Sequence, residues 1–258
     1  MTDSKKMPIL FVGHGSPMNA IEDNMYTKNW ENIVEKIPQP KAILAISAHW
    51  YTPGIRINDA AEPKQVYDMY GFPKALYRLK YPAKGASTTA KQVKDLLGDD
   101  LRIDNGWGID HGTWSVLCRM YPKADVPICQ LSVNKQLDAK EHFVLGQKLR
   151  QLRENGVLLF ASGNIVHNLG EVNWNMEKGH VWASAFDDYI KDKIKGQQYD
   201  AVIDYKSAGA SADKAFVLPD HFYPLLYILG AADTNDKLHI FNDSCTLGSL
   251  SMTSYLFS

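Results

Sequence analysis

Five of the eight histidines lie where an apolar segment ends or where a helical pattern begins. His14 follows the apolar run ILFVG, His49 follows AILAISA, and His167 comes shortly after VLLFASG. His111, in the segment GIDHGTW, and His221, in LPDHFYP, each precede a helical pattern. Because ligands of open α/β sheets bind outside the carboxyl ends of the strands, we expect these imidazoles to converge. Imidazole is the commonest metal ligand in proteins, so the pattern indicates a metal centre.

Two glycines, Gly13 and Gly15, flank the first of these histidines. We expect them to let the backbone turn tightly and to let a metal ion or a substrate approach the ring closely. The other three histidines are interpreted as structural. His142 lies in an amphipathic helical pattern and is expected to face solvent, His180 opens a helix, and His239 belongs to a strand.

Short apolar runs alternate with helical patterns, which is typical of an α/β fold. Four nearly continuous apolar runs predict strands buried on both faces, at residues 8–13, 41–48, 126–133 and 156–163. Two runs with more alternation predict edge or half-exposed strands at 237–243 and 250–257. Helices are expected at 87–98, 137–156, 180–196 and 221–231. With no linker or repeat in the sequence, residues 1–258 are predicted to form a single α/β domain whose mostly parallel or mixed central sheet is flanked by helices.

The composition argues against several classes of protein. The 28 Lys and Arg residues and 29 Asp and Glu residues give a formal net charge of −1, so there is no positive surplus to attract nucleic acid. No apolar run approaches the length of a membrane span. Three widely separated cysteines, Cys118, Cys129 and Cys245, disfavour a disulfide framework. We therefore expect a cytoplasmic protein without nucleic-acid or membrane partners, as a monomer or a homodimer.

Catalytic motifs of other classes do not match. The segment GHGSPM lacks the third glycine of a dinucleotide-binding fingerprint, and there is no Walker A loop. The absence of GxSxG argues against an α/β-hydrolase elbow, and the absence of HExxH argues against a zincin protease. The histidines remain the best candidates for chemistry.

Five motifs, in this order and across nearly the whole chain, carry a specific family resemblance. GHGSPM, SAHW, DHGTW, SGNIVHNL and PDHFYPLLYILGA together resemble the class III extradiol ring-cleavage dioxygenases, in the branch of the 4,5-DOPA extradiol dioxygenases. The resemblance implies a non-haem metal-dependent oxidoreductase that opens the aromatic ring of a DOPA-like catechol with O2. The expected product is a muconic semialdehyde.

The same resemblance implies roles for the histidines. His14, His49 and His221 would hold one divalent metal ion, Fe(II) for ring cleavage or Zn(II) in the protein as isolated, since three imidazoles suit both metals. His167 matches the acid–base histidine of the family and could also act as a fourth metal ligand. His111 would be a pocket residue that donates a hydrogen bond to charge developing on oxygen.

Aromatic residues beside two of these histidines, Trp50 and Tyr223, are candidates for a slot that binds the substrate ring, with core packing as the alternative for each. Two other functions also stay open. A zinc-dependent hydrolase could use the same histidines to ionise a water molecule. A non-catalytic metal-binding protein could keep the fold and the metal without the reaction.

Overall fold

The strands predicted from continuous apolar runs form the parallel centre of one sheet in the computed structural model, which describes residues 6–258. In spatial order they are β5 (Ile128–Asn134), β2 (Ala42–Thr52), β6 (Val157–Gly163) and β1 (Ile9–Gly13). Along β1, Ile9 and Phe11 pack into one core layer, whereas Leu10 and Val12 pack into the other. Burial on both faces explains why these strands carry so few polar residues.

Shorter strands extend the sheet at both edges and make it mixed. Beside β5 lie β3 (Ile55–Ile57), which is antiparallel to it, and β4 (Leu101–Ile103). Beside β1 lie β10 (Ser254–Phe257) and β7 (Leu238–Phe241), both in antiparallel pairings. The resulting order is β4-β3-β5-β2-β6-β1-β10-β7, so the predicted single domain with a mixed sheet is confirmed. The strand predicted at 250–257 is interrupted, because β9 (Leu250–Ser251) leaves this sheet and pairs with β8 (Cys245–Thr246).

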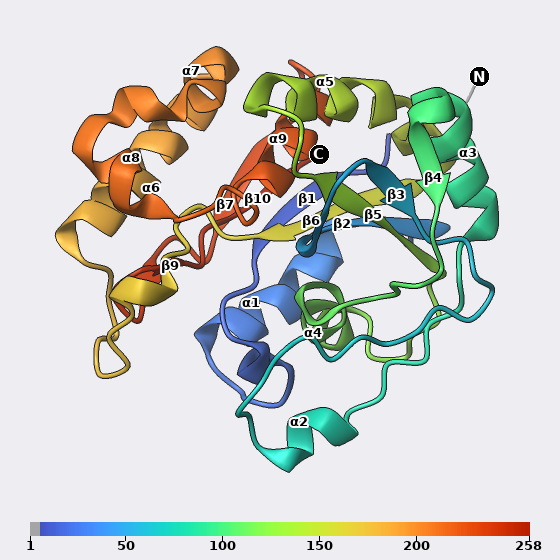
Figure 1. The fold of residues 1–258 in the computed structure, drawn as a ribbon, viewed down its shortest axis with the longest axis horizontal. Coiled ribbons are helices and arrows are strands. Elements are labelled where there is room, and N and C mark those ends of the chain that lie inside the picture. Colours follow the sequence, from blue (N-terminus) through green and yellow to red (C-terminus); the bar gives the residue numbers. More distant parts are fainter. Residues whose placement is uncertain (1–5) are drawn as a thin grey trace.

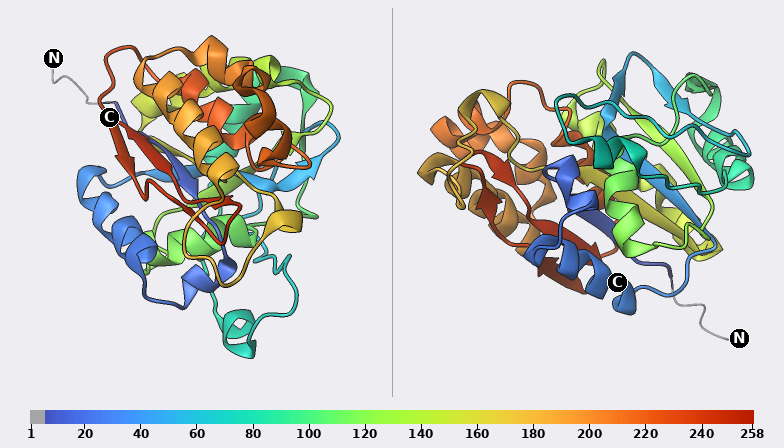
Figure 2. Two further views of the ribbon diagram at one scale, coloured as in Figure 1. Left: turned by 90° about the vertical axis from the view of Figure 1, so that its left-hand side faces the viewer. Right: turned by 90° about the horizontal axis from the view of Figure 1, so that it is seen from below.

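Helices cover both faces of the sheet (Figures 1 and 2). One layer contains α3 (Ser87–Leu97), α5 (Ala139–Leu149), α6 (Val181–Lys195) and α9 (Tyr223–Ala231), together with the short α7 (Tyr199–Ile203) and α8 (Ala212–Ala215). The opposite layer contains α1 (Met25–Ile33), α2 (Lys74–Arg78) and α4 (His111–Met120). Single 3-10 segments lie at Pro17–Ala20, Val34–Lys36, Gly98–Asp100, Arg150–Asn155, Leu169–Glu171 and Tyr205–Ser211.

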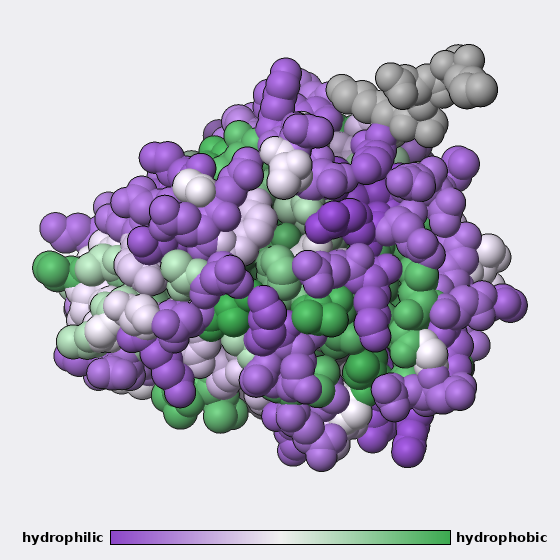
Figure 3. Space-filling view, turned by 90° about the horizontal axis from the view of Figure 1, so that it is seen from above, coloured by the Kyte–Doolittle hydropathy of each residue, from purple (hydrophilic) through white to green (hydrophobic). Residues whose placement is uncertain are grey.

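The predicted helices are present, with shifted ends. Asp138 caps α5 in a reciprocal capping box with Glu141. The α-helix then ends at Leu149 and continues as a 3-10 segment to Gly156, whose left-handed φ of 79° ends it. No helix within residues 6–258 is both long and apolar enough to cross a membrane. On the face drawn in Figure 3, hydrophilic residues predominate and hydrophobic ones are scattered among them.

Candidate metal centre

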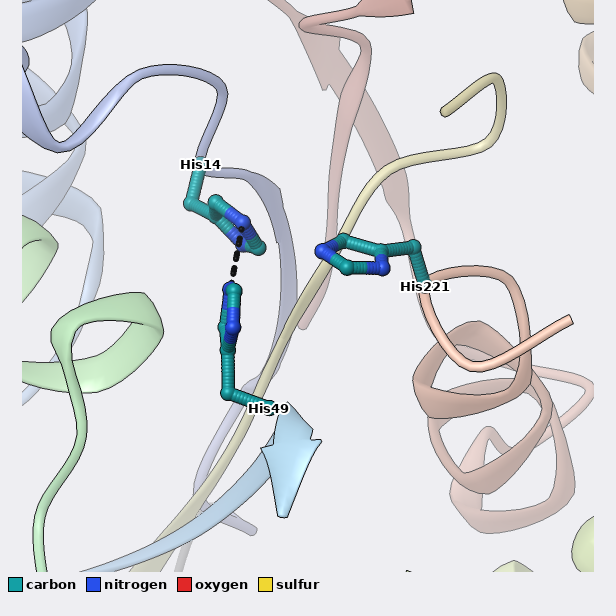
Figure 4. A group of neighbouring side chains, drawn as sticks. All are labelled: His14, His49 and His221. Carbon is teal, nitrogen blue, oxygen red and sulfur yellow. Dashed lines mark hydrogen bonds between the residues drawn. The ribbon is translucent and has the colours of Figure 1, made fainter. Parts of the chain in front are cut away.

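Three histidines from distant parts of the chain meet at the carboxyl ends of the parallel strands. His14 directly follows β1, His49 lies near the end of β2, and His221 lies two residues before α9. Their ring centroids are 4.9–5.3 Å apart, and each offers a ligand nitrogen within 4.8 Å of the others. Figure 4 shows His14 and His49 facing each other, with His221 reaching toward them from the side. The expected convergence of these three imidazoles is therefore present in the fold.

The position of His49 depends on an irregularity in β2. The pairing of β2 with β5 shifts register between Ile46 and Tyr51, which face Leu131 and Val133 respectively. The bulged segment carries Ser47 to Trp50 and so turns His49 away from the regular alternation. The sequence placed His49 just after a strand that ends at residue 48, whereas the strand continues to Thr52.

Hydrogen bonds fix which nitrogen of His14 carries the proton. The Ser162 hydroxyl donates to the Gly112 carbonyl oxygen at 2.5 Å and lies 2.9 Å from His14 Nδ1. Because a hydroxyl has one proton to donate, Ser162 Oγ must accept the hydrogen bond from His14 Nδ1. The neutral ring of His14 therefore carries a free lone pair at Nε2.

His49 has the same tautomer for a different reason. Its Nδ1 lies 3.1 Å from a carboxylate oxygen of Asp68, which can only accept, so the neutral ring leaves Nε2 unprotonated. The two Nε2 atoms of His14 and His49 are 3.2 Å apart. Two lone pairs at this distance require a cation between them. A tetrahedral metal ion with bonds of about 2.0–2.1 Å would place two ligand nitrogens roughly 3.3 Å apart, so the pair fits a metal ion.

His221 supplies the third imidazole without a hydrogen bond of its own. The side chain is buried, and among residues 6–258 neither ring nitrogen has a hydrogen-bond partner, although Asp220 Oδ2 lies 3.2 Å from Nδ1 in poor geometry. An unpartnered buried nitrogen is costly unless a ligand satisfies it. Burial, and then the neighbouring imidazoles, hold the pKa of His221 and of His14 well below the ordinary value, which keeps both rings neutral as metal binding requires.

The pKa of His49 moves in the opposite direction. Burial lowers it, but the hydrogen bond to Asp68 and the nearby carboxylates of Asp110 and Asp220 outweigh burial and raise it overall. A protonated His49 could bridge to His14 through Nε2, so a proton and a metal ion compete for the same place between the two rings.

The other two histidines of the predicted cluster border the same centre. The ring of His167 stacks on that of His221, with centroids 3.4 Å apart and planes 4° apart. The ring of His111 lies 3.9 Å from that of His49, and its Nδ1 donates to Asp68 at 2.9 Å. All five histidines line one cavity of about 500 Å³, a size typical of small-molecule sites.

The glycines beside His14 serve backbone packing. A Cβ atom on Gly13 would come within 2.7 Å of the Met252 backbone, and one on Gly15, whose φ is +60°, would lie 2.4 Å from the Met252 sulfur. The expectation that both glycines clear space for a metal ion or substrate is therefore wrong for Gly13. Gly15 does line the cavity, but the space that a side chain at this position would need is occupied by Met252.

Trp50 and Tyr223 do not line this cavity, so both expectations of a substrate wall are corrected. Trp50 is buried, and its ring stacks near that of Trp107 with 6.3 Å between the ring centroids. Tyr223 faces a different pocket beside Tyr205. For both residues the alternative of packing between elements describes the structure better.

Much of the remaining cavity wall comes instead from two segments, one before α2, which sequence patterns did not mark, and one that follows His167. One contributes Asp68 with Met69, Tyr70 and Phe72, and the other contributes Leu169, Val172 and Trp174. Asp220, next to a predicted ligand, is the second acidic residue in the wall. Its position beside His221 could have identified Asp220 as a site residue from the sequence. Asp68, in contrast, lies in a loop without periodicity or a motif.

The remaining histidines lie elsewhere. His180 opens α6 and contacts the carbonyl of Glu171, and His239 is an exposed strand residue, both as expected. His142 is not solvated: it is fully buried in α5, with Nδ1 3.0 Å from the hydroxyl of Tyr227 in α9. It shares the buried face of its helix with Leu145 and Leu149, three and seven residues onward.

Comparisons with known proteins agree with this geometry. A family model described as the catalytic LigB subunit of aromatic ring-opening dioxygenase matches residues 8–258. Proteins named 4,5-DOPA dioxygenase extradiol from Escherichia coli K12 and Beta vulgaris are 42% and 38% identical, covering 97% and 96% of this chain and 94% and 95% of the relatives. A crystal structure of an uncharacterized protein from E. coli K12 matches with a TM-score of 0.86 and 37% identity over 98% of this chain and all of the other. This chain therefore belongs to the LigB family of extradiol ring-cleavage dioxygenases.

Proposed function

We propose that this chain is a metal-dependent extradiol dioxygenase that opens the ring of a DOPA-like catechol with O2 and yields a muconic semialdehyde. In this proposal His14, His49 and His221 hold one divalent cation, and residues 1–258 act as one catalytic domain. The observation that carries the proposal is that Nε2 of His14 and Nε2 of His49 face each other 3.2 Å apart, beside a third imidazole whose ring nitrogens form no hydrogen bond within residues 6–258. The names of the relatives support the catechol substrate.

The metal identity follows from the reaction. Three imidazoles accept Zn(II) as readily as Fe(II), and zinc is a candidate for the protein as isolated. When bound, Fe(II) supplies the electron transfer between a catecholate and O2 that closed-shell Zn(II) cannot supply. We therefore propose Fe(II) as the active metal.

His167 is the proposed acid–base residue. Burial is the main reason that its pKa is lowered to about 4, so the ring is neutral at pH 7 and can accept a proton from a catechol hydroxyl. Within residues 6–258 no side chain forms a hydrogen bond with its ring nitrogens, and the ring borders the cavity. An imidazole stacked on a metal ligand and otherwise free can also return that proton later in the reaction, or approach the metal as a fourth ligand.

His111 has a constrained role beside it. Since Nδ1 donates to Asp68 and burial lowers the pKa of the ring, neutral His111 has no proton at Nε2. It would accept a hydrogen bond or a proton from bound substrate there, in contrast to the donor role expected from the sequence. Apolar wall residues, including Met69, Phe72 and Leu250, would exclude water around the ring.

The test is oxygen uptake by anaerobically prepared protein loaded with Fe(II), using a panel of catechols that includes DOPA. We expect uptake together with a yellow product, and negligible uptake by the zinc-loaded protein. Failure with every catechol, accompanied by zinc-dependent ester hydrolysis, would establish the hydrolase instead. The three free cysteines, Cys118, Cys129 and Cys245, support a reducing, cytoplasmic location for the proposed enzyme.

Substitutions separate metal binding from proton transfer. Alanine at His14, His49 or His221 should remove most of the bound metal, whereas His167→Ala should keep the metal and the fold but lose turnover. His239→Ala, at an exposed histidine in β7, is the matched control. Turnover of His167→Ala at the wild-type rate would eliminate the role proposed for that ring.

A further inference from the structure

We propose that Asp68 is a positioning residue that holds a metal ligand and a pocket histidine with one carboxylate. The inference rests on the proposed function for the metal at His14, His49 and His221. Asp68 lies between β3 and α2 in an irregular segment, with a side chain 15% exposed. It is the residue through which that segment contacts both His49 and His111.

The contacts are divided between the two carboxylate oxygens. Oδ2 lies 3.1 Å from Nδ1 of His49. Oδ1 accepts from Nδ1 of His111 at 2.9 Å and from the backbone N–H of the same residue at 3.0 Å. A carboxylate is an acceptor on both oxygens, so it favours a proton at Nδ1 on both rings at once.

The consequence for His49 concerns metal binding. A free imidazole can carry its proton on either nitrogen, and a proton on Nε2 would occupy the lone pair that faces His14. Asp68 selects the tautomer with an unprotonated Nε2 and restricts rotation of the ring. His14 obtains the same tautomer from Ser162, so the two facing nitrogens are prepared by separate partners.

The consequence for His111 concerns the bound substrate. The hydrogen bonds from its ring and its backbone N–H hold the start of α4 against the segment that carries Asp68. The next residue, Met69, belongs to the cavity wall. Asp68 thus connects a metal ligand, a pocket imidazole and the wall through one side chain, and its loss should affect both metal affinity and turnover.

Asparagine and alanine at position 68 test this assignment, with Glu62→Gln in the same segment as the control, since Glu62 is exposed and forms an ion pair with Lys84. Asparagine keeps one acceptor oxygen and alanine keeps none. We expect the affinity of metal-free protein for Zn(II), measured by chelator competition, to fall about 10–100-fold in Asp68→Asn and further in Asp68→Ala. Cobalt-loaded variants should show altered visible spectra, and Glu62→Gln should match the wild type.

Activity provides a second readout. Asp68→Ala saturated with Fe(II) should have a lower kcat with a smaller change in KM, because His111 has lost its partner while the wall remains. Wild-type affinity, spectrum and kcat in Asp68→Ala with a native circular dichroism spectrum would overturn the inference. So would a second metal ion bound per wild-type chain and lost on substitution, which would make Asp68 a ligand. If the wild type opens no catechol but the variants still lose metal affinity, the proposed function fails and the positioning role stands.

Discussion

Gly112 offers a sharp test of how tightly the metal centre is built. It is the second residue of α4, and a Cβ atom there would lie 2.8 Å from His49 Cδ2 and 2.9 Å from Ser47 Oγ. Ordinary contact begins at 3.4 Å, so the ring of His49 would have to retreat by 3.4 − 2.8 = 0.6 Å. Cδ2 is bonded to Nε2, the atom assigned to the metal, and metal–ligand distances tolerate only about 0.2 Å.

We therefore expect Gly112→Ala to lower metal affinity by one to two orders of magnitude, as disruption of a metal's supporting residues typically does. The fold should tolerate the change, because alanine is the better helix former by about 1 kcal/mol and offsets part of the crowding. Stability and metal affinity should thus respond differently to one methyl group.

The assay combines chelator competition for Zn(II) with thermal unfolding of the metal-free protein. Gly196→Ala is the matched control, since its added Cβ atom would meet nothing closer than 3.4 Å at an ordinary φ of −82°. The reasoning is refuted if Gly112→Ala binds metal within twofold of the wild type while the protein remains folded.

Three further predictions concern charge. Asp220 and an apolar wall border the cavity. Catechols with a cationic or uncharged substituent should therefore have a higher kcat/KM than a catechol of equal length that carries a carboxylate. A preference for the carboxylate would contradict this prediction. Asp236→Ala should lower the free energy of unfolding, measured in urea, by about 3 kcal/mol, because it leaves the buried guanidinium of Arg153 without its carboxylate partner. A loss of less than 1 kcal/mol would contradict this prediction. Burial is the main reason that the pKa of Asp187 is raised to about 6, so between pH 4 and 6 the folded state retains a proton that the unfolded state has lost. The unfolding free energy of the wild type should therefore fall, relative to Asp187→Asn, by about 3 kcal/mol as the pH rises through this window, and parallel pH profiles would exclude the linkage.

The sequence predicted the strands that carry the site because strands of this kind depend on local patterns of apolar residues. Continuous apolarity marked the four buried strands, and the carboxyl ends of parallel strands share one edge, which brought His14 and His49 together. The predicted strand at 41–48 stopped short of His49, because the bulge in β2 depends on its pairing with β5 and leaves no periodic signal.

The missed features depend on contacts between distant segments. Asp68 acquires its role only when its loop folds over the strand ends, and nothing in its immediate neighbours indicates this. Trp50 was expected beside the substrate because it adjoins His49, but it lies in the bulged part of β2, and its ring packs beside Trp107 instead. His142 was expected in solvent because it lies in an amphipathic helical pattern, although the hydroxyl of Tyr227 satisfies one ring nitrogen inside the core.

The place of β1 in the sheet has a consequence for biosynthesis. Ile9 pairs with Leu159 on one side and with Phe257 on the other, so during synthesis β1 acquires its second neighbour only after β10 has emerged from the ribosome. Until then its apolar side chains lack their partners and resemble a chaperone substrate. His221 lies just before α9, so a nascent chain cannot bring the three imidazoles together until that part of the chain has emerged as well.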